Sequence, residues 1–431
     1  YTLIHGVGGD SNLAPATAPT LNSVYNNTNF TVGGFTRSAT DLQVDITAAS
    51  PLAVAYWRGG LSNGNISNAN QTWAASNGST ASNWSATAPN GAAQPLIPGA
   101  NTDVYLGASP AGNDAWTSYL GADMSIKSLN INTTNTTNSL NLNADGGYSL
   151  TIGSGGINLL GAPNNQTITI NAAIMLSASQ TWTNNSPWNG AYGQNYLTIN
   201  GNVDTQGNTL TLNALGSRNT PTINGSIMGG GGLIKNGGYQ VALGGANTYT
   251  GPTTINAGTL YLGGSGSINQ SSTIAINHAA LYLGNGTGDT GVNRLGNSTP
   301  ITADGGNLQF ANGASAGVVY SETVGTVTLN SGQFDILENT SQTGGSGNQQ
   351  TLTLSGLAHN GTSAVTFSAV ANPDVYQTPT GLNTTTNIIR NTAFGSATPA
   401  GQIIGPWATV GRSTSQQKDY AVYDASGNIV G

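Results

Sequence analysis

The sequence contains no cysteine and very little charge. Without cysteine in 431 residues, disulfides and thiolate metal sites are excluded. Only 6% of the residues are charged, against about 25% in an average soluble protein, so solubility must come from neutral polar side chains. The three lysines, Lys127, Lys235 and Lys418, lie far apart. Nucleic acid is therefore not an expected partner, because phosphate binding needs clustered Lys and Arg.

Long apolar runs are also missing. No apolar segment reaches the length of about 20 residues that a membrane-spanning helix needs, and we expect no membrane span in this chain. The first residues, 1–5, have neither the basic start nor the apolar core of a signal peptide, so we expect a mature chain or a portion of a longer protein. With 37% hydrophobic residues and 62 glycines, the composition favours a folded β protein over disorder.

Residues 233–262 have the pattern of short strands separated by turns. Apolar side chains alternate in 241–243, 253–255 and 259–262, and Gly-Gly, Asn-Thr, Gly-Pro and Ala-Gly pairs lie between these runs. Leu-Tyr-Leu-Gly at 260–263 recurs at 281–284. A fixed period of about 21 residues predicts a solenoid, in which each coil is covered by the next one.

This segment resembles the autotransporter-associated β-strand repeat of secreted bacterial β-helical proteins. The residues that carry the resemblance are Leu243, Gly245, Ala246, Asn247, Thr248, Tyr249, Thr250, Gly251, Thr253, Thr254, Ile255, Ala257, Gly258, Thr259 and Leu260. Looser similarity extends to a tryptophan-rich opening (73, 83–85, 98–106) and to a closing segment (404–410, 419–424). The resemblance implies a right-handed parallel β-helix outside the cell and does not imply one biochemical activity.

Alternating apolar residues predict many further strands along the chain. We expect an all-β fold with four parts: a divergent N-terminal cap or exchanged-strand segment at 1–55, with strands at 32–36 and 42–47; a Trp/Asn/Gly-rich opening region at 56–106; the parallel β-helix at 107–405; and a closing segment at 406–431. Asn and Thr recur at alternate positions, so we expect side-chain hydrogen bonds along the stacked coils. The predicted β-helix strands are 126–131, 140–142, 148–152, 157–160, 167–170, 174–176, 197–199, 210–212, 221–223, 273–276, 281–283, 307–310, 326–329, 334–337, 351–354 and 364–367.

Catalytic and metal-binding patterns are weak, and we assign no catalytic, cofactor-binding or metal-binding residue. Asp335 and Glu338 are the closest acids near predicted strands, but alternation puts them on opposite faces, which favours a salt-bridge or capping role at a loop end. His5, His278 and His359 lie far apart and suit turns or the surface. Two isolated Asp-Gly turns, at 145–146 and 304–305, indicate β-turns in preference to calcium loops.

Three tryptophans in the opening region allow two interpretations. Trp57, Trp73 and Trp84 suit a carbohydrate platform or the plugged end of a core, and the second is favoured because aromatic residues in β-rich turns usually pack inward.

The function we expect is that of an extracellular, cell-surface structural or adhesive protein: a stalk, fibre or matrix subunit without enzyme activity. We expect end-to-end self-association, because the chain ends at Gly431 without a charged tail, and a surface glycan or a host or matrix molecule as ligand. The alternative is a carbohydrate-active enzyme, a polysaccharide lyase or glycosidase, or a carbohydrate-binding module on the same fold.

Overall fold

The chain folds into two compact units, Tyr1–Gly201 and Asn202–Gly431, and each is built almost entirely of strands. The computed structural model describes residues 2–5, 24–25, 29–37, 41–61, 71–88, 91–107, 116–132, 140–160, 167–185, 196–216, 220–284, 293–311, 319–340, 349–371, 387–393, 398–411 and 417–431. Apart from one 3-10 turn, η3 (Asp145–Gly147), these ranges contain no helix. The predicted all-β class is confirmed.

The first unit contains short parallel strands that follow one another as the coils of a solenoid. Strand β10 pairs in parallel with β8 on one side and with β12 on the other, so Val104, Leu129 and Ile157 stack in one fully buried column. Its strands are β1 (Thr2–His5), β2 (Val24–Tyr25), β3 (Phe30–Arg37), β4 (Asp41–Ala48), β5 (Leu52–Trp57), β6 (Ala75–Ser76), β7 (Trp84–Ser85), β8 (Pro98–Leu106), β9 (Trp116–Tyr119), β10 (Met124–Ile131), β11 (Leu140–Asn143), β12 (Ser149–Leu159), β13 (Thr167–Ile170), β14 (Ala173–Leu176), β15 (Gln180–Asn184) and β16 (Tyr196–Ile199).

The second unit repeats this plan and contains the expected period. Leu260 pairs with Leu281, so the 21-residue repeat is one coil of the solenoid. Its strands are β17 (Val203–Asp204), β18 (Leu210–Ala214), β19 (Thr222–Ile223), β20 (Ile227–Met228), β21 (Leu233–Asn236), β22 (Gln240–Leu243), β23 (Thr253–Ile255), β24 (Thr259–Leu262), β25 (Ile274–Leu283), β26 (Ile301–Ala311), β27 (Val319–Thr340), β28 (Gln349–His359), β29 (Ala364–Ala371), β30 (Asn387–Asn391), β31 (Ala408–Gly411), β32 (Gln417–Tyr420), β33 (Val422–Tyr423) and β34 (Ile429–Val430).

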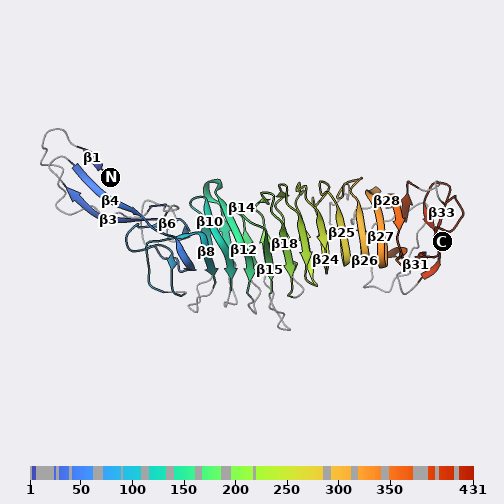
Figure 1. Ribbon diagram of the computed structural model, residues 1–431, viewed down its shortest axis with the longest axis horizontal. Helices are drawn as coiled ribbons and strands as arrows, with labels where there is room; N and C mark the ends of the chain where they lie inside the picture. Colours follow the sequence, from blue (N-terminus) through green and yellow to red (C-terminus); the bar gives the residue numbers. More distant parts are fainter. Residues whose placement is uncertain are drawn as a thin grey trace. The chain divides into compact units, whose positions relative to one another are not determined.

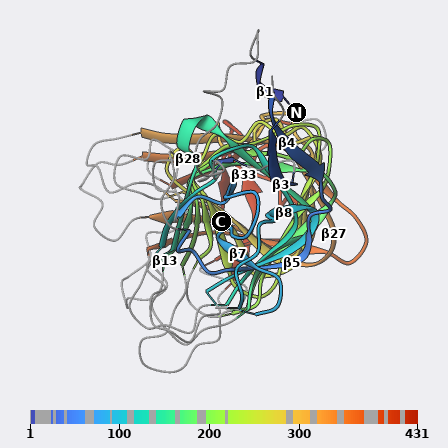
Figure 2. The same cartoon turned by 90° about the vertical axis from the view of Figure 1, so that its left-hand side faces the viewer.

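Each coil is held by columns of inward-pointing apolar side chains. Along a strand every second residue points inward, and parallel register then places like residues above one another. Val241, Leu260, Leu281, Leu308 and Ile336 form such a column through β22, β24, β25, β26 and β27, and none is more than 2% exposed. Burying one such side chain contributes about 1.5–3 kcal/mol. Figure 1 shows the successive strands of each unit side by side, and Figure 2 shows the same cartoon turned by 90°.

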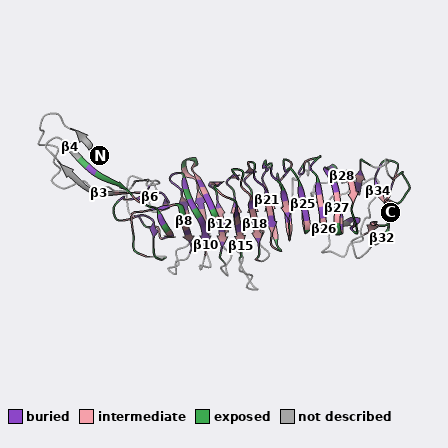
Figure 3. Ribbon diagram, in the orientation of Figure 1, coloured by how far each residue is buried: buried purple, intermediate pink, exposed green. Residues whose placement is uncertain are grey.

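The N-terminal strands differ from the coils. β1, β4 and β3 form an antiparallel sheet in which β4 is central, and most of β4 is exposed (green in Figure 3). The two strands predicted between 32 and 47 are thereby confirmed. The parallel pairing begins with β5, which pairs with β8.

Most predicted strands are present, although several join into longer ones. The predictions at 148–152 and 157–160 both overlap β12, those at 273–276 and 281–283 overlap β25, and those at 326–329 and 334–337 are within β27. Short strands with few alternating apolar residues, such as β9, β15 and β30, were not predicted. Residues 341–348, between β27 and β28, lie outside the described residues.

Candidate functional site

Asparagine side chains form hydrogen-bonded ladders on the outside of the first unit. Asn171 donates from Nδ2 to Oδ1 of Asn143 (2.7 Å), and Asn200 donates in the same way to Asn171 (2.8 Å). Each partner lies one coil away, 28 or 29 residues along the chain. The side-chain bonds expected along the stack are therefore confirmed.

The second unit has the same device at closer spacing. Asn256 donates to Asn236 (3.0 Å) and Asn277 donates to Asn256 (2.8 Å), across coils of 20 and 21 residues. The column continues with Asp304 and Ser331, whose hydroxyl donates to the Asp304 carboxylate (2.8 Å). All these bonds are exposed, so the outer surface carries neutral amides that are already partnered with one another.

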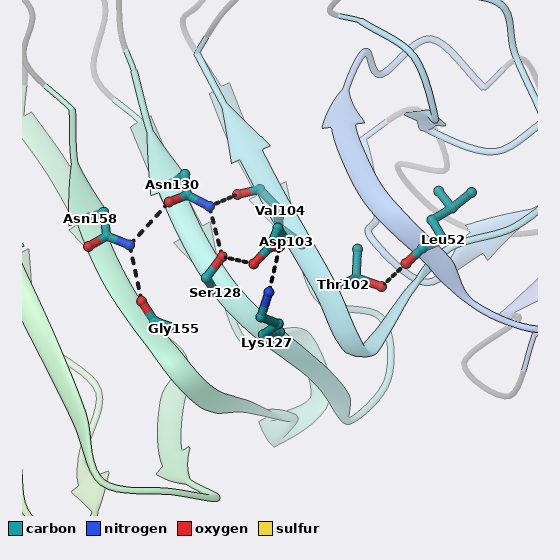
Figure 4. A network of polar contacts seen from close by, with 9 residues as sticks. All are labelled: Leu52, Thr102, Asp103, Val104, Lys127, Ser128, Asn130, Gly155 and Asn158. Carbon is teal, nitrogen blue, oxygen red and sulfur yellow. Dashed lines mark hydrogen bonds and ion pairs between the residues drawn. The ribbon is translucent and has the colours of Figure 1, made fainter.

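A larger polar network crosses the first coils of the first unit (Figure 4). Lys127 Nζ lies 2.8 Å from Asp103 Oδ2, and Ser128 donates to Asp103 Oδ1 (2.6 Å). Asn130 donates to Ser128 and accepts from Asn158. Burial raises the pKa of Asp103, but hydrogen bonds from Lys127 and Ser128 and the lysine charge outweigh it and hold that pKa below its usual value. This network connects three neighbouring strands, β8, β10 and β12.

The residues of the repeat motif mostly hold one coil against the next. Asn247 is 1% exposed; its Oδ1 accepts from Ile227 N (2.9 Å), and its Nδ2 donates to the carbonyls of Gly245 (2.9 Å) and Ser267 (2.8 Å). The side chain thus satisfies backbone groups of three successive coils at a corner where no strand supplies partners.

Tyr249 and Thr253 of the motif form a buried hydroxyl chain. The Tyr249 hydroxyl lies 2.6 Å from Thr253 Oγ1, which lies 2.9 Å from Ser271 Oγ. Ser271 donates to the Gly251 carbonyl (3.0 Å). Because Tyr249 is 1% exposed, this partner lets an aromatic ring fill the core without leaving its hydroxyl unpaired.

The other motif residues divide into core and close-approach positions. Leu243, Ile255 and Leu260 are fully buried. A Cβ on Gly245 or Gly251 would collide with the backbone of the preceding coil, and Gly258 has φ +65° at a corner, where glycine is favoured. Of the remaining six, Ala246 bridges to Ser267, and Thr248 and Thr250 donate their N–H groups to the carbonyls of Ile227 (2.8 Å) and Gly229 (3.0 Å). Ala257 accepts from Lys235 Nζ, and Thr254 and Thr259 lie in β23 and β24.

The three tryptophans of the opening region are core residues. Trp73 and Trp84 are fully buried and Trp57 is 5% exposed; their rings contact edge to face, with the Trp84 centroid 4.9 Å from Trp57 and 5.1 Å from Trp73. Trp84 Nε1 donates to the Trp73 carbonyl and Trp73 Nε1 to Ser118. The packing interpretation is confirmed, and a sugar platform at these residues is not present.

Asp335 and Glu338 lie on opposite faces of β27, as predicted. Alternation along the strand places Phe334, Ile336 and Glu338 inward, and burial raises the pKa of Asp335 to about 6 against a hydrogen bond from Gln333. The loop-end role expected for Glu338 is wrong, because its side chain is fully buried within the coil and accepts the Leu352 amide (3.0 Å).

Further buried charges were not predicted. Glu322, 1% exposed, accepts from the backbone N–H groups of Arg294 (3.1 Å) and Leu295 (3.0 Å). Burial raises the Glu322 pKa to about 7, opposed by these amides and by the Arg294 charge. Lys235 is also fully buried and donates to three backbone carbonyls, and burial lowers its pKa to about 8. The sequence did contain a signal for both residues. Each lies two positions from a buried apolar residue of its strand, so alternation places its side chain inward.

The histidines and Asp-Gly turns have structural partners. His278 is exposed at a corner with φ +51°, as expected, whereas His359 is half-buried, with its ring stacked on Trp407 at 4.4 Å. Asp145 accepts from Gly121 N. The side chain of His5 lies outside the described residues. Within the described ranges, no group of three or more His, Asp or Glu side chains could hold a metal ion.

Comparison with known proteins agrees with this geometry. Residues 233–262 match the passenger-associated-transport-repeat. A stretch of 138 residues is 29% identical to the adhesin BmaC autotransporter of Brucella suis biovar 1 (strain 1330); it covers 31% of this chain and 4% of that adhesin. The chain thus spans a small part of this relative. No solved structure matches the chain.

The expected resemblance is confirmed: the chain is a β-solenoid that contains an autotransporter-type repeat. The passenger-associated-transport-repeat spans β21 to β24, and its polar residues Asn247 and Thr253 bond to neighbouring coils. In the part of the chain that the structure describes, no helix is long and apolar enough to cross a membrane. The polar side chain of Asn247 thus forms its hydrogen bonds with backbone groups of the solenoid itself.

Proposed function

We propose that this chain is part of an extracellular, adhesin-like surface protein and that its solenoid is a non-catalytic stalk or matrix element. Support comes from the passenger-associated-transport-repeat at 233–262 and from the similarity to an adhesin autotransporter. Outside the cell, coils whose stability comes from stacked hydrogen bonds need no disulfides, which suits a chain without cysteine.

The observation that carries the proposal is the use of the polar side chains on the outer surface. The Asn143–Asn171–Asn200 and Asn236–Asn256–Asn277 ladders join successive coils, so their amides add lateral hydrogen bonds to the backbone ladder. A surface of this kind resists separation of the coils and carries little charge. Binding groups are then placed on turns and on inserted segments between the strands.

An enzyme on the same fold finds no support among the described residues. Glycoside hydrolysis needs two carboxylates about 5–10 Å apart on one face, and the nearest pair in sequence, Asp335 and Glu338, is divided between the outside and the core. We therefore propose no catalytic residue. The proposed ligand is a surface glycan or a host or matrix molecule, and the proposed self-association is end to end.

Adhesion of coated beads tests the proposal. Beads that carry the purified chain should bind host cells or extracellular matrix more strongly than albumin-coated beads. The control variant I255D places a charge at a fully buried position and should lose this binding with its fold. Binding no greater than that of albumin on every surface would overturn the adhesive role, and release of sugars from a polysaccharide panel would replace it with an enzyme. Sedimentation at rising concentration tests self-association.

A further inference from the structure

Among the described residues of the second unit, four buried side-chain oxygens have no hydrogen-bond partner: Asp335 Oδ1, Ser368 Oγ, Glu338 Oε2 and Gln350 Oε1. Glu338 on β27 and Gln350 on β28 are both fully buried. Glu338 Oε1 accepts from Leu352 N (3.0 Å) and Gln350 Nε2 donates to the Phe310 carbonyl (2.8 Å). The second oxygen of each side chain, Glu338 Oε2 and Gln350 Oε1, is unpaired. Leaving a buried polar atom unpaired is unfavourable, so the unpaired oxygens of Glu338 and Gln350 require an explanation.

The two side chains lie in the same corner of the core. Glu338 stacks on Phe310 in the parallel register of β26 and β27, and Gln350 bonds to the carbonyl of that same Phe310. Glu338 in turn bonds to Leu352, two residues beyond Gln350 on the same face of β28. Both residues therefore reach the same neighbours from the end of one coil and the start of the next.

Among the residues that the structure describes, no positive charge compensates an ionised Glu338. Its next neighbour along the stack is Ala369 of β29, a strand without charged residues. Arg390 on β30 donates from Nε to Asn428 instead. Burial raises the pKa of Glu338 well above its ordinary value, and the Leu352 amide is the one opposing cause. The other titratable groups on β26, β27 and β28 are Asp304, Tyr320, Glu322, Asp335 and His359, and the buried Tyr320 pairs in register with Gln350.

We propose that Glu338 keeps its proton in the folded protein and donates it from Oε2 to Oε1 of Gln350, which makes this corner a proton-dependent latch between two coils. One hydrogen then satisfies both unpaired oxygens, while Glu338 Oε1 still accepts from Leu352. When the proton is lost as pH rises, an anion remains in an apolar corner, and the contact between β27 and β28 weakens there first.

The sign of the pH effect follows from linkage. The folded state holds a proton that the unfolded state releases near the ordinary value of 4.5, so this contribution to stability is complete below that pH. It decreases as pH rises toward the folded pKa, by up to about tenfold in the folding constant per pH unit. The adhesive role does not enter this argument.

Glutamine is the matched test, because an amide reproduces the bonds of the protonated acid. In E338Q, Nε2 can donate to Gln350 and Oε1 can accept from Leu352. We expect E338Q to equal or exceed the wild type in stability at about pH 8 and to lack the pH-dependent loss described above. The control E322Q replaces an acid that accepts two backbone amides beside Arg294, and we expect it to be less stable than the wild type at the same pH.

The protonation of Glu338 can also be measured directly in the wild type, which does not depend on whether E338Q folds. Glu322 and Glu338 are the only glutamates in the sequence, so carboxyl-labelled glutamate gives two carbon-13 NMR signals in the full chain. In a pH titration the Glu338 signal should keep the chemical shift of a protonated acid well above its ordinary pKa of 4.5, and E322Q assigns it by removing the other signal. A Glu338 signal that ionises near pH 4.5, or a loss of stability in E338Q that is equal at every pH, would overturn the latch.

Discussion

The two units place their charged side chains differently. In the first unit the described ion pair, Asp103 and Lys127, lies on the outside, with side chains 29% and 47% exposed. In the second unit Lys235, Arg294, Glu322 and Glu338 are each 3% exposed or less. Both units nevertheless have the same apolar columns and the same asparagine ladders. The solenoid pattern therefore tolerates an ionisable side chain at an inward position when backbone groups of its own or a neighbouring coil can bind it.

This difference predicts that stability responds differently in the two units to salt and to removal of a charged side chain. An exposed pair contributes little, because water and salt screen it and two long side chains must be ordered. A buried charge adds little net stability when intact, but its removal leaves unpaired groups in the core and costs several kcal/mol. In the second unit we therefore expect substitutions of the buried polar groups to destabilise the protein strongly. In the first unit, where the described ion pair is exposed, we expect the largest loss of stability from the buried tryptophan cluster.

Removal of Trp84 should have the largest effect. In W84A the first unit loses a fully buried ring, its contacts with Trp57 and Trp73, and the bond to the Trp73 carbonyl, which costs about 4 kcal/mol. The matched control in the second unit is W407A, because Trp407 is only half-buried against His359 and should cost less. Hydrogen exchange on the full chain locates the loss. Equal losses in the two variants would contradict a core role for the cluster.

Removal of Glu322 should come next, with a loss of about 3 kcal/mol. In E322A the buried N–H groups of Arg294 and Leu295 lose their acceptor. Because the folded pKa of Glu322 is raised to about 7 from 4.5, its proton-linked contribution is complete below pH 4.5 and falls as pH rises to 7. Urea unfolding across this interval should therefore show a weaker pH dependence in E322A than in the wild type. An unchanged slope would show that Glu322 is ionised throughout.

Sequence alternation predicted the columns and the ladders but only part of the buried polar chemistry. The alternation of side chains from Phe334 to Glu338 is enough to place Glu338 inward. It cannot show that the backbone N–H of Leu352, on the next strand, donates to Glu338. Likewise, Arg294 reaches the carbonyls of Gly264 and Gly266, 30 and 28 residues earlier. These partners depend on the lengths of the inserted segments between strands, which set the register of each coil and have no periodic signal of their own.

Removal of the exposed pair should have the smallest effect. In K127M, Asp103 loses its cation at 2.8 Å but keeps the Ser128 hydrogen bond at 2.6 Å, so we expect a loss below about 1 kcal/mol at low salt. At about 1 M salt, where the Debye length is about 3 Å, wild type and K127M should unfold at the same urea concentration. A larger loss that persists in high salt would mean that Lys127 supports the network of Figure 4 by packing. The contrast between an exposed pair in one unit and buried charges in the other would then not account for the difference in stability effects.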